Sequence, residues 1–243
     1  MIVNYPRMRR RAAWPSDLDT ALEFTSPEVF SISAPKNWDG KIEYTNGNGW
    51  KTWDGSAISS GEIKNNHCIY LRGTGNSKIN GDSYGVWSIA GTNIACNGAI
   101  DLLLDYATVK SGNHPTMADH CYYSMFRGCT SLTAAPSLPA TTLAIYCYNS
   151  MFWDCTSLTA APSLPATTLA DYCYASMFRY CTKIKLSTTA SGTYTKTYRI
   201  PKNGTGTTAS GALNSMFANT GGTFKGTPEI NTTYYLDESN TIV

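Results

Sequence analysis

Eight cysteines are the residues of this chain with the most specific potential chemistry, because thiolates bind metal ions and paired thiols form disulfides. Six of them form two series with a constant step of 26 residues, which are Cys121, Cys147 and Cys173, and Cys129, Cys155 and Cys181. Neighbouring members of the two series stand eight residues apart, unlike the short spacing of zinc knuckles, and no histidine recurs with the step. We therefore interpret the series as columns of buried thiols, which behave as small hydrophobic residues.

Cys68 and Cys96 lie outside both series, and their spacing does not decide whether they form a disulfide. The three histidines, His67, His114 and His120, fall in no zinc-protease motif and no nucleophile elbow. No set of acid, base and nucleophile is visible in the sequence. We therefore predict a non-enzymatic protein with no catalytic residue, no metal site and no cofactor.

The 26-residue step aligns positions that differ between otherwise identical copies. We expect such positions to have no role in packing. These columns are Arg127, Trp153 and Arg179; Gly128, Asp154 and Tyr180; Tyr123, Asn149 and Ala175; and His120, Tyr146 and Tyr172. Exposed aromatic and arginine side chains are typical of recognition surfaces, because they give a large contact area at a low entropic cost. The columns are therefore our candidate recognition surface. The alternative, in which they only solvate the outer face, stays open.

Repeated units in the sequence position these columns. Residues 129–144 read CTSLTAAPSLPATTLA, and residues 155–170 repeat the same sixteen letters. A Met-Phe pair keeps the phase at 125–126, 151–152 and 177–178, and it recurs at 216–217, after a Gly- and Thr-rich insertion. One unit buries too little apolar surface alone, so the units must stack, with caps at both ends.

Within a unit, we predict a helical stretch at 146–153, because Cys147 and Met151 would share one helix face. Residues 158–161 are predicted to form a short strand, which the following prolines end because they cannot donate to a ladder.

The segment CYNSMFWDCTSLTAAPSLPATTLA, residues 147–170, and its neighbours resemble the BspA-like leucine-rich repeats of bacterial and bacteriophage-encoded surface proteins. The resemblance covers residues 94–235, and a looser one links segments 40–53 and 70–75 to the β domain that precedes the repeats in similar proteins. It implies adhesion, host recognition or virion decoration without catalysis. Such proteins often carry many copies and a secretion signal, whereas residues 1–17 lack the apolar run of a signal. We therefore expect a component of a phage or phage-derived virion.

The predicted fold class is mainly β with short helices (α+β). We expect an N-terminal arm at 1–27, a small antiparallel β-sandwich at 28–93, a leucine-rich-repeat-like solenoid of 26-residue coils with a degenerate C-terminal cap at 94–235, and a tail at 236–243. Strand-like runs in the sandwich lie at 29–33, 41–44, 50–53, 67–72 and 84–89. Between two of them, Asn46-Gly47-Asn48-Gly49 predicts a hairpin turn, because such turns need residues that tolerate positive φ.

We predict that the arm docks the chain onto other virion or surface proteins, with a helical turn at 16–22 that Ser16 would cap. The candidate docking residues are Arg7, Arg9, Arg10, Arg11 and Trp14. The second expected partner is a protein or glycan receptor on a host surface. A homo-oligomer stays open.

Composition excludes two other partners. The net charge is +2 and 15% of residues are charged, so no long-range field attracts nucleic acid. No run of about 18 apolar residues occurs, so we expect no membrane insertion.

Two alternative functions remain at this level. One is a carbohydrate-binding or adhesin module of a bacterial surface protein, with sugars stacked on Trp38, Trp50, Trp53 or Trp87. A hydroxyl-lined face could also suit sugars, and it would comprise Thr133, Ser137, Thr159 and Ser163. The other alternative is a purely structural virion subunit. The predicted location is accordingly the virion surface, as tail, fibre or head decoration, or else the bacterial cell surface or the extracellular space.

Overall fold

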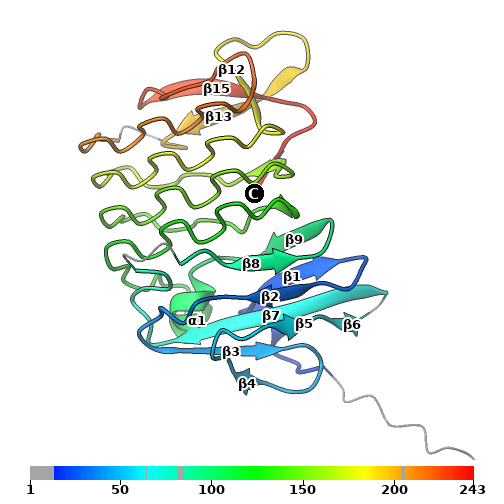
Figure 1. The fold of residues 1–243 in the computed structure, drawn as a ribbon. Helices are drawn as coiled ribbons and strands as arrows, with labels where there is room; N and C mark the ends of the chain where they lie inside the picture. The colour runs from blue at the N-terminus through cyan, green and yellow to red at the C-terminus, as the bar shows by residue number, and fades with distance from the viewer. Residues whose placement is uncertain (1–13, 64, 82–84, 204–205) are drawn as a thin grey trace, which may run out of the picture.

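The computed structural model describes residues 14–63, 65–81, 85–203 and 206–243. The chain is mainly β and has several sheets, none of them closed. Figure 1 shows a sheet region made by the N-terminal part of the chain, a stack of coils beside it, and C-terminal strands over the far end of the stack. The predicted docking residues Arg7, Arg9, Arg10 and Arg11 lie outside the described residues.

Seven strands form the largest sheet, in the order β10-β9-β1-β7-β3-β4, with β6 also paired to β7. Their bounds are β1 Leu22–Ser26, β3 Lys41–Thr45, β4 Lys51–Thr52, β6 Gly61–Ile63, β7 Asn66–Thr74, β9 Ile94–Asn97 and β10 Leu132–Ala134. All pairings are antiparallel except that of β9 with β10. Strand β10 belongs to the first coil. Its pairing with β9 therefore joins the stack of coils to the edge of the sheet through backbone hydrogen bonds.

This sheet corrects two predicted boundaries. Strand β1 lies between β7 and β9, so the end of the segment predicted as an arm is a central strand. The boundary predicted between residues 93 and 94 falls within the sheet, because β9 pairs with β1. Just before β1, the short 3-10 helix η1 (Leu18–Thr20) has Asp17 at its N-cap position, whereas the sequence suggested Ser16.

A second, three-stranded sheet has the order β5-β2-β8, with bounds β2 Ser31–Ser33, β5 Ile58–Ser59 and β8 Ser88–Ala90. The apolar residues of both sheets join one continuous core. The predicted strands at 41–44 and 67–72 are confirmed as β3 and β7, and the other predicted runs overlap with the shorter strands β2, β4 and β8. The predicted hairpin is confirmed too, because β3 pairs with β4 and both Gly47 and Gly49 have positive φ.

Helix α1 (Leu102–Lys110), which is interrupted at Asp105, leads from the sheets into the first coil. No helix among the described residues is long and apolar enough to span a membrane.

Each coil contains a flat run of successive turns, at residues 119–129, 145–155, 171–181 and 210–220, which together we call the turn ladder. Alternate residues donate their backbone N–H to the next coil, as from Tyr122 to the carbonyl of Cys147, at 2.8 Å. The residues between them donate three positions back within their own coil, as Met125 does to Tyr122. Every fourth residue has a positive φ, between +52° and +73°. The helix predicted at 146–153 is therefore wrong.

The side of the turn ladder that faces the core stacks identical side chains in register. Phe126, Phe152, Phe178 and Phe217 form one fully buried column, with ring centroids 5.4 to 5.8 Å apart. The contact of Phe217 with Phe178 confirms the fourth, degenerate copy and its 39-residue offset. At the near end Phe126 meets Trp87 edge-on, so the column continues into the core of the sheets.

Both ends of the stack are capped. At the near end, the backbone nitrogens of Ile79 and Trp87 donate to carbonyls of the first coil. At the far end lies a four-stranded sheet in the order β13-β15-β12-β14, with bounds β12 Lys185–Ser187, β13 Tyr194–Ile200, β14 Gly221–Gly222 and β15 Thr232–Asp237. The predicted insertion after the third unit thus supplies a strand of this cap, β13.

The C-terminal segment, predicted as a tail, is a structural part of the stack. Strand β16 (Thr241–Ile242) runs parallel to β11 (Ala160–Ala161) of the second coil. The side chain of Asn240 bonds to the backbone of the third coil at Lys183 and Lys185. Figure 1 accordingly places the C-terminus beside the middle of the stack.

Candidate functional site

All nine predicted recognition residues lie on the turn ladder. Along each rung, pairs of buried apolar residues such as Met125-Phe126 alternate with pairs such as Arg127-Gly128, which are partly buried and exposed. This period of four matches the positive φ at every fourth residue of the turn ladder. The variable columns therefore come together on one outer surface of the stack, which we call the outer face.

Arg127, Trp153 and Arg179 form a sandwich on the outer face. The guanidinium carbons of both arginines lie 4.6 Å from the centre of the Trp153 ring, one from the coil before it and one from the coil after it. All three side chains are partly buried. Attraction between a cation and the face of an indole stabilises such pairs by about 0.5–1 kcal/mol where they are solvent-exposed. The expectation that this column is free of packing duty is wrong, because its members pack on one another.

Within the described part of the chain, neither guanidinium of the sandwich has an ion-pair partner. The Nε atom of Arg179 is buried and has no hydrogen-bond acceptor there. Stacking leaves the N–H edges of a guanidinium unused, so both arginines keep donors for an external acceptor. Both faces of Trp153 are covered, so a sugar ring cannot stack on this indole.

A column of aromatic rings follows the other edge of the turn ladder. Tyr146 stacks between His120 and Tyr172, with ring centroids 4.8 Å apart and planes within 10° of parallel. Tyr172 lies directly over Gly211 of the fourth coil, where a Cβ atom would stand 2.3 Å from the ring. Glycine at that position therefore lets the column end against backbone, and the tyrosine rings present their edges outward.

The column of Tyr123, Asn149 and Ala175 lies between the arginine sandwich and the aromatic column, and it is only partly at the surface. Tyr123 is half-buried and meets both His120 and Tyr146 edge-on. Asn149 and Ala175 are buried, so their prediction as exposed recognition positions is wrong. The Asn149 amide oxygen accepts a 2.8 Å hydrogen bond from the hydroxyl of Ser150.

The third variable column is the most exposed part of the outer face. Gly128, Asp154 and Tyr180 all have positive φ and are exposed, and Tyr180 lies beside both Trp153 and Arg179. Asp154, the residue after Trp153, adds one carboxylate to this column. The outer face from this column to the arginine sandwich thus carries two positive charges and one negative charge.

The two cysteine columns are buried free thiols, as the sequence indicated. The thiols of Cys155 and Cys181 each donate to a backbone carbonyl of the coil before, at 2.9 Å. Burial raises the pKa of Cys129 and of Cys173 to about 12, so both stay protonated and unreactive near neutral pH.

Cys68 and Cys96 are also free thiols. They stand opposite Thr25 and Phe24, which are adjacent residues of β1. Because neighbouring residues of a strand point to opposite faces, these two thiols lie on different sides of the sheet and cannot pair.

The tryptophans proposed as sugar platforms are mostly core residues. Trp38, Trp53 and Trp87 are buried and contact one another through their rings. Trp50 is half-buried, and the guanidinium of Arg72 covers its ring at 3.9 Å. The carbohydrate-binding alternative therefore finds no open stacking platform among these four rings.

The proposed hydroxyl-lined face is engaged within the stack. The hydroxyls of Thr133, Ser137 and Thr159 donate to backbone carbonyls of the preceding segment, at 3.1 to 3.2 Å. The backbone nitrogen of Ser163 donates to the carbonyl of Val243, the residue after β16. These residues serve the stacking of the coils.

Trp14 is the one predicted docking residue that the structure describes. Its ring meets Tyr70 edge-on at 5.5 Å, and its indole nitrogen donates to the carbonyl of Glu62. The contact fixes the chain to the side of the large sheet that faces away from the main core, where Trp14 joins a small separate apolar cluster.

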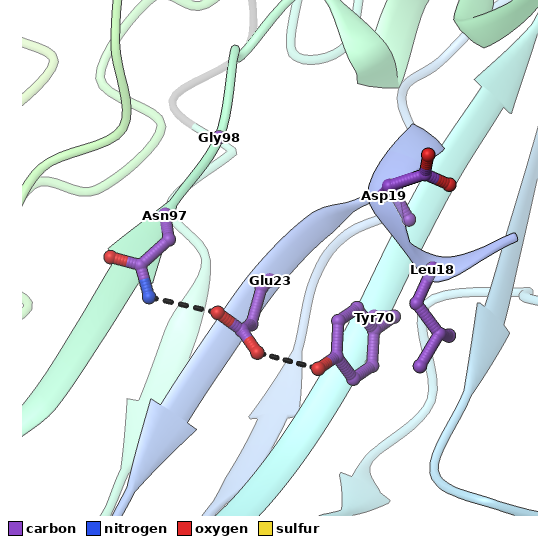
Figure 2. Close-up of a pocket in the computed structure, with 7 residues that line it drawn as sticks. Leu18, Asp19, Glu23, Tyr70, Asn97 and Gly98 are labelled. Atoms are coloured by element: carbon purple, nitrogen blue, oxygen red, sulfur yellow. Dashed lines mark hydrogen bonds between the residues drawn. The ribbon is translucent and has the colours of Figure 1, made fainter. Parts of the chain in front are cut away.

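Beside this cluster the same side of the sheet has a shallow hollow of about 320 Å³ (Figure 2). Figure 2 shows Glu23 at its centre, between Tyr70 and Asn97. One carboxylate oxygen of Glu23 accepts from the hydroxyl of Tyr70 at 2.5 Å, and the other accepts from the amide of Asn97 at 2.9 Å. Both oxygens of Glu23 are thus engaged, and burial with this nearby carboxylate raises the pKa of Tyr70, whereas the carboxylate of Asp19 also lines the hollow.

Sequence reasoning missed a buried tyrosine column. Tyr122, Tyr148 and Tyr174 stack with nearly parallel rings, 5.5 to 5.8 Å apart. The hydroxyls of Tyr148 and Tyr174 are buried and have no hydrogen-bond partner among the described residues. The signal was present, since a tyrosine follows the first cysteine in each of the three units.

Within the described ranges, no three side chains of His, Cys, Asp or Glu come close enough together to hold a metal ion. Comparison of the chain with protein-family models, with curated proteins and with solved structures finds no match.

Proposed function

We propose that this chain is a non-enzymatic recognition protein, built from a β-sandwich and a leucine-rich-repeat-like solenoid, that binds a surface partner through the outer face. One observation carries the proposal. The two guanidiniums of the arginine sandwich lie on a shared indole and have no ion-pair partner in the described part of the chain.

The rigidity of the ladder supports this function. Hydrogen bonds from coil to coil and parallel stacking hold the outer face from both sides, so its side chains lose little freedom on binding. Tyrosine, tryptophan and arginine are the residue types that dominate binding energy in protein interfaces.

The setting that we propose is a phage or phage-derived virion, with the segment before Trp14 as the attachment to other virion proteins. The repeat resemblance supports this setting. Trp14 packs on Tyr70 of the sheet region, and the outer face lies on the turn ladder of the stack.

The test is binding of the labelled full chain to a panel of bacterial cells, measured by flow cytometry. The Arg127→Gln/Arg179→Gln variant should lose at least tenfold in affinity for any strain that binds the wild type. The matched control is Lys110→Gln/Lys183→Gln, which removes two exposed positive charges elsewhere and should bind like the wild type. Equal binding by the arginine variant and the wild type would exclude this site, and binding to no strain would reject a host-recognition role.

A further inference from the structure

We propose that the arginine sandwich is the binding site for an acidic glycan, whose carboxylate or sulfate groups pair with Arg127 and Arg179. The inference rests on the proposed function and names the ligand class of that site.

The two guanidiniums need acceptors. Arginine donates five N–H bonds in a fixed fork, which matches a carboxylate or sulfate with two parallel hydrogen bonds. Their π faces are occupied by Trp153, whereas their edges have no protein carboxylate as partner in the described residues. The Nε of Arg179 is buried and out of a ligand's reach, so a ligand would accept from the terminal nitrogens of the guanidinium.

The distance between the two guanidiniums favours a ligand whose anionic groups are a similar distance apart. With Trp153 between them, the two guanidinium carbons stand roughly 9 Å apart, which agrees with two strand spacings. Charges on a nucleic-acid strand follow at about 3.4 Å along the axis. Side chains on one side of an extended peptide follow at about 6.6 Å. A polysaccharide with one acidic sugar per disaccharide separates its anions more widely than either.

The rest of the outer face also favours a hydroxyl-rich ligand. Tyr146 and Tyr172 use their ring faces on each other and turn their edges outward, so they contribute polar rim contacts and no stacking platform. A net charge of +2 gives no long-range attraction for a dense polyanion. Recognition by two directed guanidiniums and polar edges is suited to a sparsely charged polymer.

The other carboxylates near the turn ladder differ in their engagement. Asp119 and Asp171 each accept a backbone N–H from the following coil, at 3.0 and 2.8 Å, so they fasten the coils together. Asp154 is exposed beside the sandwich and opposes an anionic ligand. Its neutralisation should therefore strengthen the binding that the arginines provide.

The experiment measures the affinity of the full chain, by biolayer interferometry, for hyaluronan, chondroitin sulfate, neutral dextran, poly-glutamate and oligo-dT. We expect binding to hyaluronan or chondroitin sulfate that weakens with salt, and at least tenfold weaker binding to the other three probes. Hyaluronan carries only carboxylates, whereas chondroitin sulfate carries carboxylates and sulfates. Binding to both would therefore identify the carboxylate as the ligand group, and binding to chondroitin sulfate alone would identify the sulfate.

Three variants test the geometry. Arg127→Gln and Arg179→Gln should each weaken glycan binding at least fivefold, and Asp154→Asn should tighten it about twofold or more. Thermal unfolding confirms that each variant is folded, and the Lys110→Gln/Lys183→Gln control should bind unchanged. Glycan binding that is absent, or that survives loss of both arginines, would overturn the proposal, as would equally tight binding to poly-glutamate or oligo-dT. Cell binding that needs the arginines without any glycan binding would reject the ligand class alone and leave the proposed function standing.

Discussion

The side-chain oxygen of Asn240 accepts a 2.9 Å hydrogen bond from the backbone nitrogen of Lys185, 55 residues earlier in the chain. The amide nitrogen of the same side chain donates to the carbonyl of Lys183 at 2.8 Å. Strand β16 meanwhile pairs with the second coil. The C-terminus therefore joins the second coil to the third on the strand side, where their own strands do not pair.

Removal of this joint should destabilise the stack. Asn240 is fully buried, so Asn240→Ala leaves the nitrogen of Lys185 and the carbonyl of Lys183 without partners, which costs about 2–3 kcal/mol of unfolding free energy. Chemical denaturation measures the loss, and hydrogen exchange should accelerate at Lys185 and along residues 159–163. Asn214→Ala, at an exposed asparagine of the fourth coil, is the control with little expected effect. Equal stability of the two variants would contradict a role of the C-terminal segment in joining the second coil to the third.

The tyrosine column allows a matched comparison of buried hydroxyls. Tyr148 has no hydrogen-bond partner among the described residues, whereas Tyr198, also buried, donates to the carbonyl of Pro162 at 2.9 Å. Tyr148→Phe should therefore raise the unfolding free energy or leave it unchanged, and Tyr198→Phe should lower it by about 1 kcal/mol. Urea unfolding of the two variants checks the order. A loss at Tyr148 as large as that at Tyr198 would indicate that an ordered water serves the Tyr148 hydroxyl.

Stacking of the units was predictable from the sequence, but the local backbone was not. Cys147 and Met151 fit one face of a helix, and they fit a flat ladder with a period of four equally well. The two structures differ in where the N–H groups go. A helix satisfies them four residues back, whereas Tyr148 donates to Cys173 in the next coil. Such a partner is invisible to a local pattern.

Other failures left a signal in the sequence. Residues 22–26 alternate buried Leu22, Phe24 and Ser26 with more polar residues, which is the period of a strand, although the segment was assigned to an arm. In one variable column, cations and an aromatic ring alternate as Arg127, Trp153 and Arg179. Each residue is therefore of a type that can pack on the residue in the next copy. Variation between copies therefore indicated mutual packing as well as exposure. The pairing of β16 with β11 had no sequence signal, because the paired residues Ala160 and Thr241 are 81 residues apart.

The strained ladder positions make a third prediction. Ser124 has φ +53° and a buried hydroxyl without a partner among the described residues. Glycine adopts this conformation without the cost of roughly 1–2 kcal/mol that a side chain incurs, and it removes the unpaired hydroxyl. Ser124→Gly should therefore raise the unfolding free energy by about 0.5–1 kcal/mol. Ser150→Gly is the comparison, with a smaller gain, because Ser150 loses its bond to Asn149. Destabilisation by Ser124→Gly would contradict the backbone strain argued for the turn ladder.

The thiol columns make the stability of the chain sensitive to alkaline pH. The pKa of Cys129 and of Cys173 rises from about 9 to about 12 in the folded chain, because burial disfavours the thiolate. A group whose pKa is raised by folding stabilises the folded state below its unfolded pKa, and this contribution is lost as pH rises from about 9 towards 12. The slope is roughly 1.4 kcal/mol per pH unit for each thiol in that window. Urea unfolding between pH 8 and 11 should therefore show that the unfolding free energy of the wild type falls steeply with pH. For Cys129→Ala the fall per pH unit should be smaller by the contribution of one thiol, whatever the stability of that variant at pH 8. An unchanged slope would mean that Cys129 already ionises in the folded chain, and in that case a thiol reagent would modify it without denaturant.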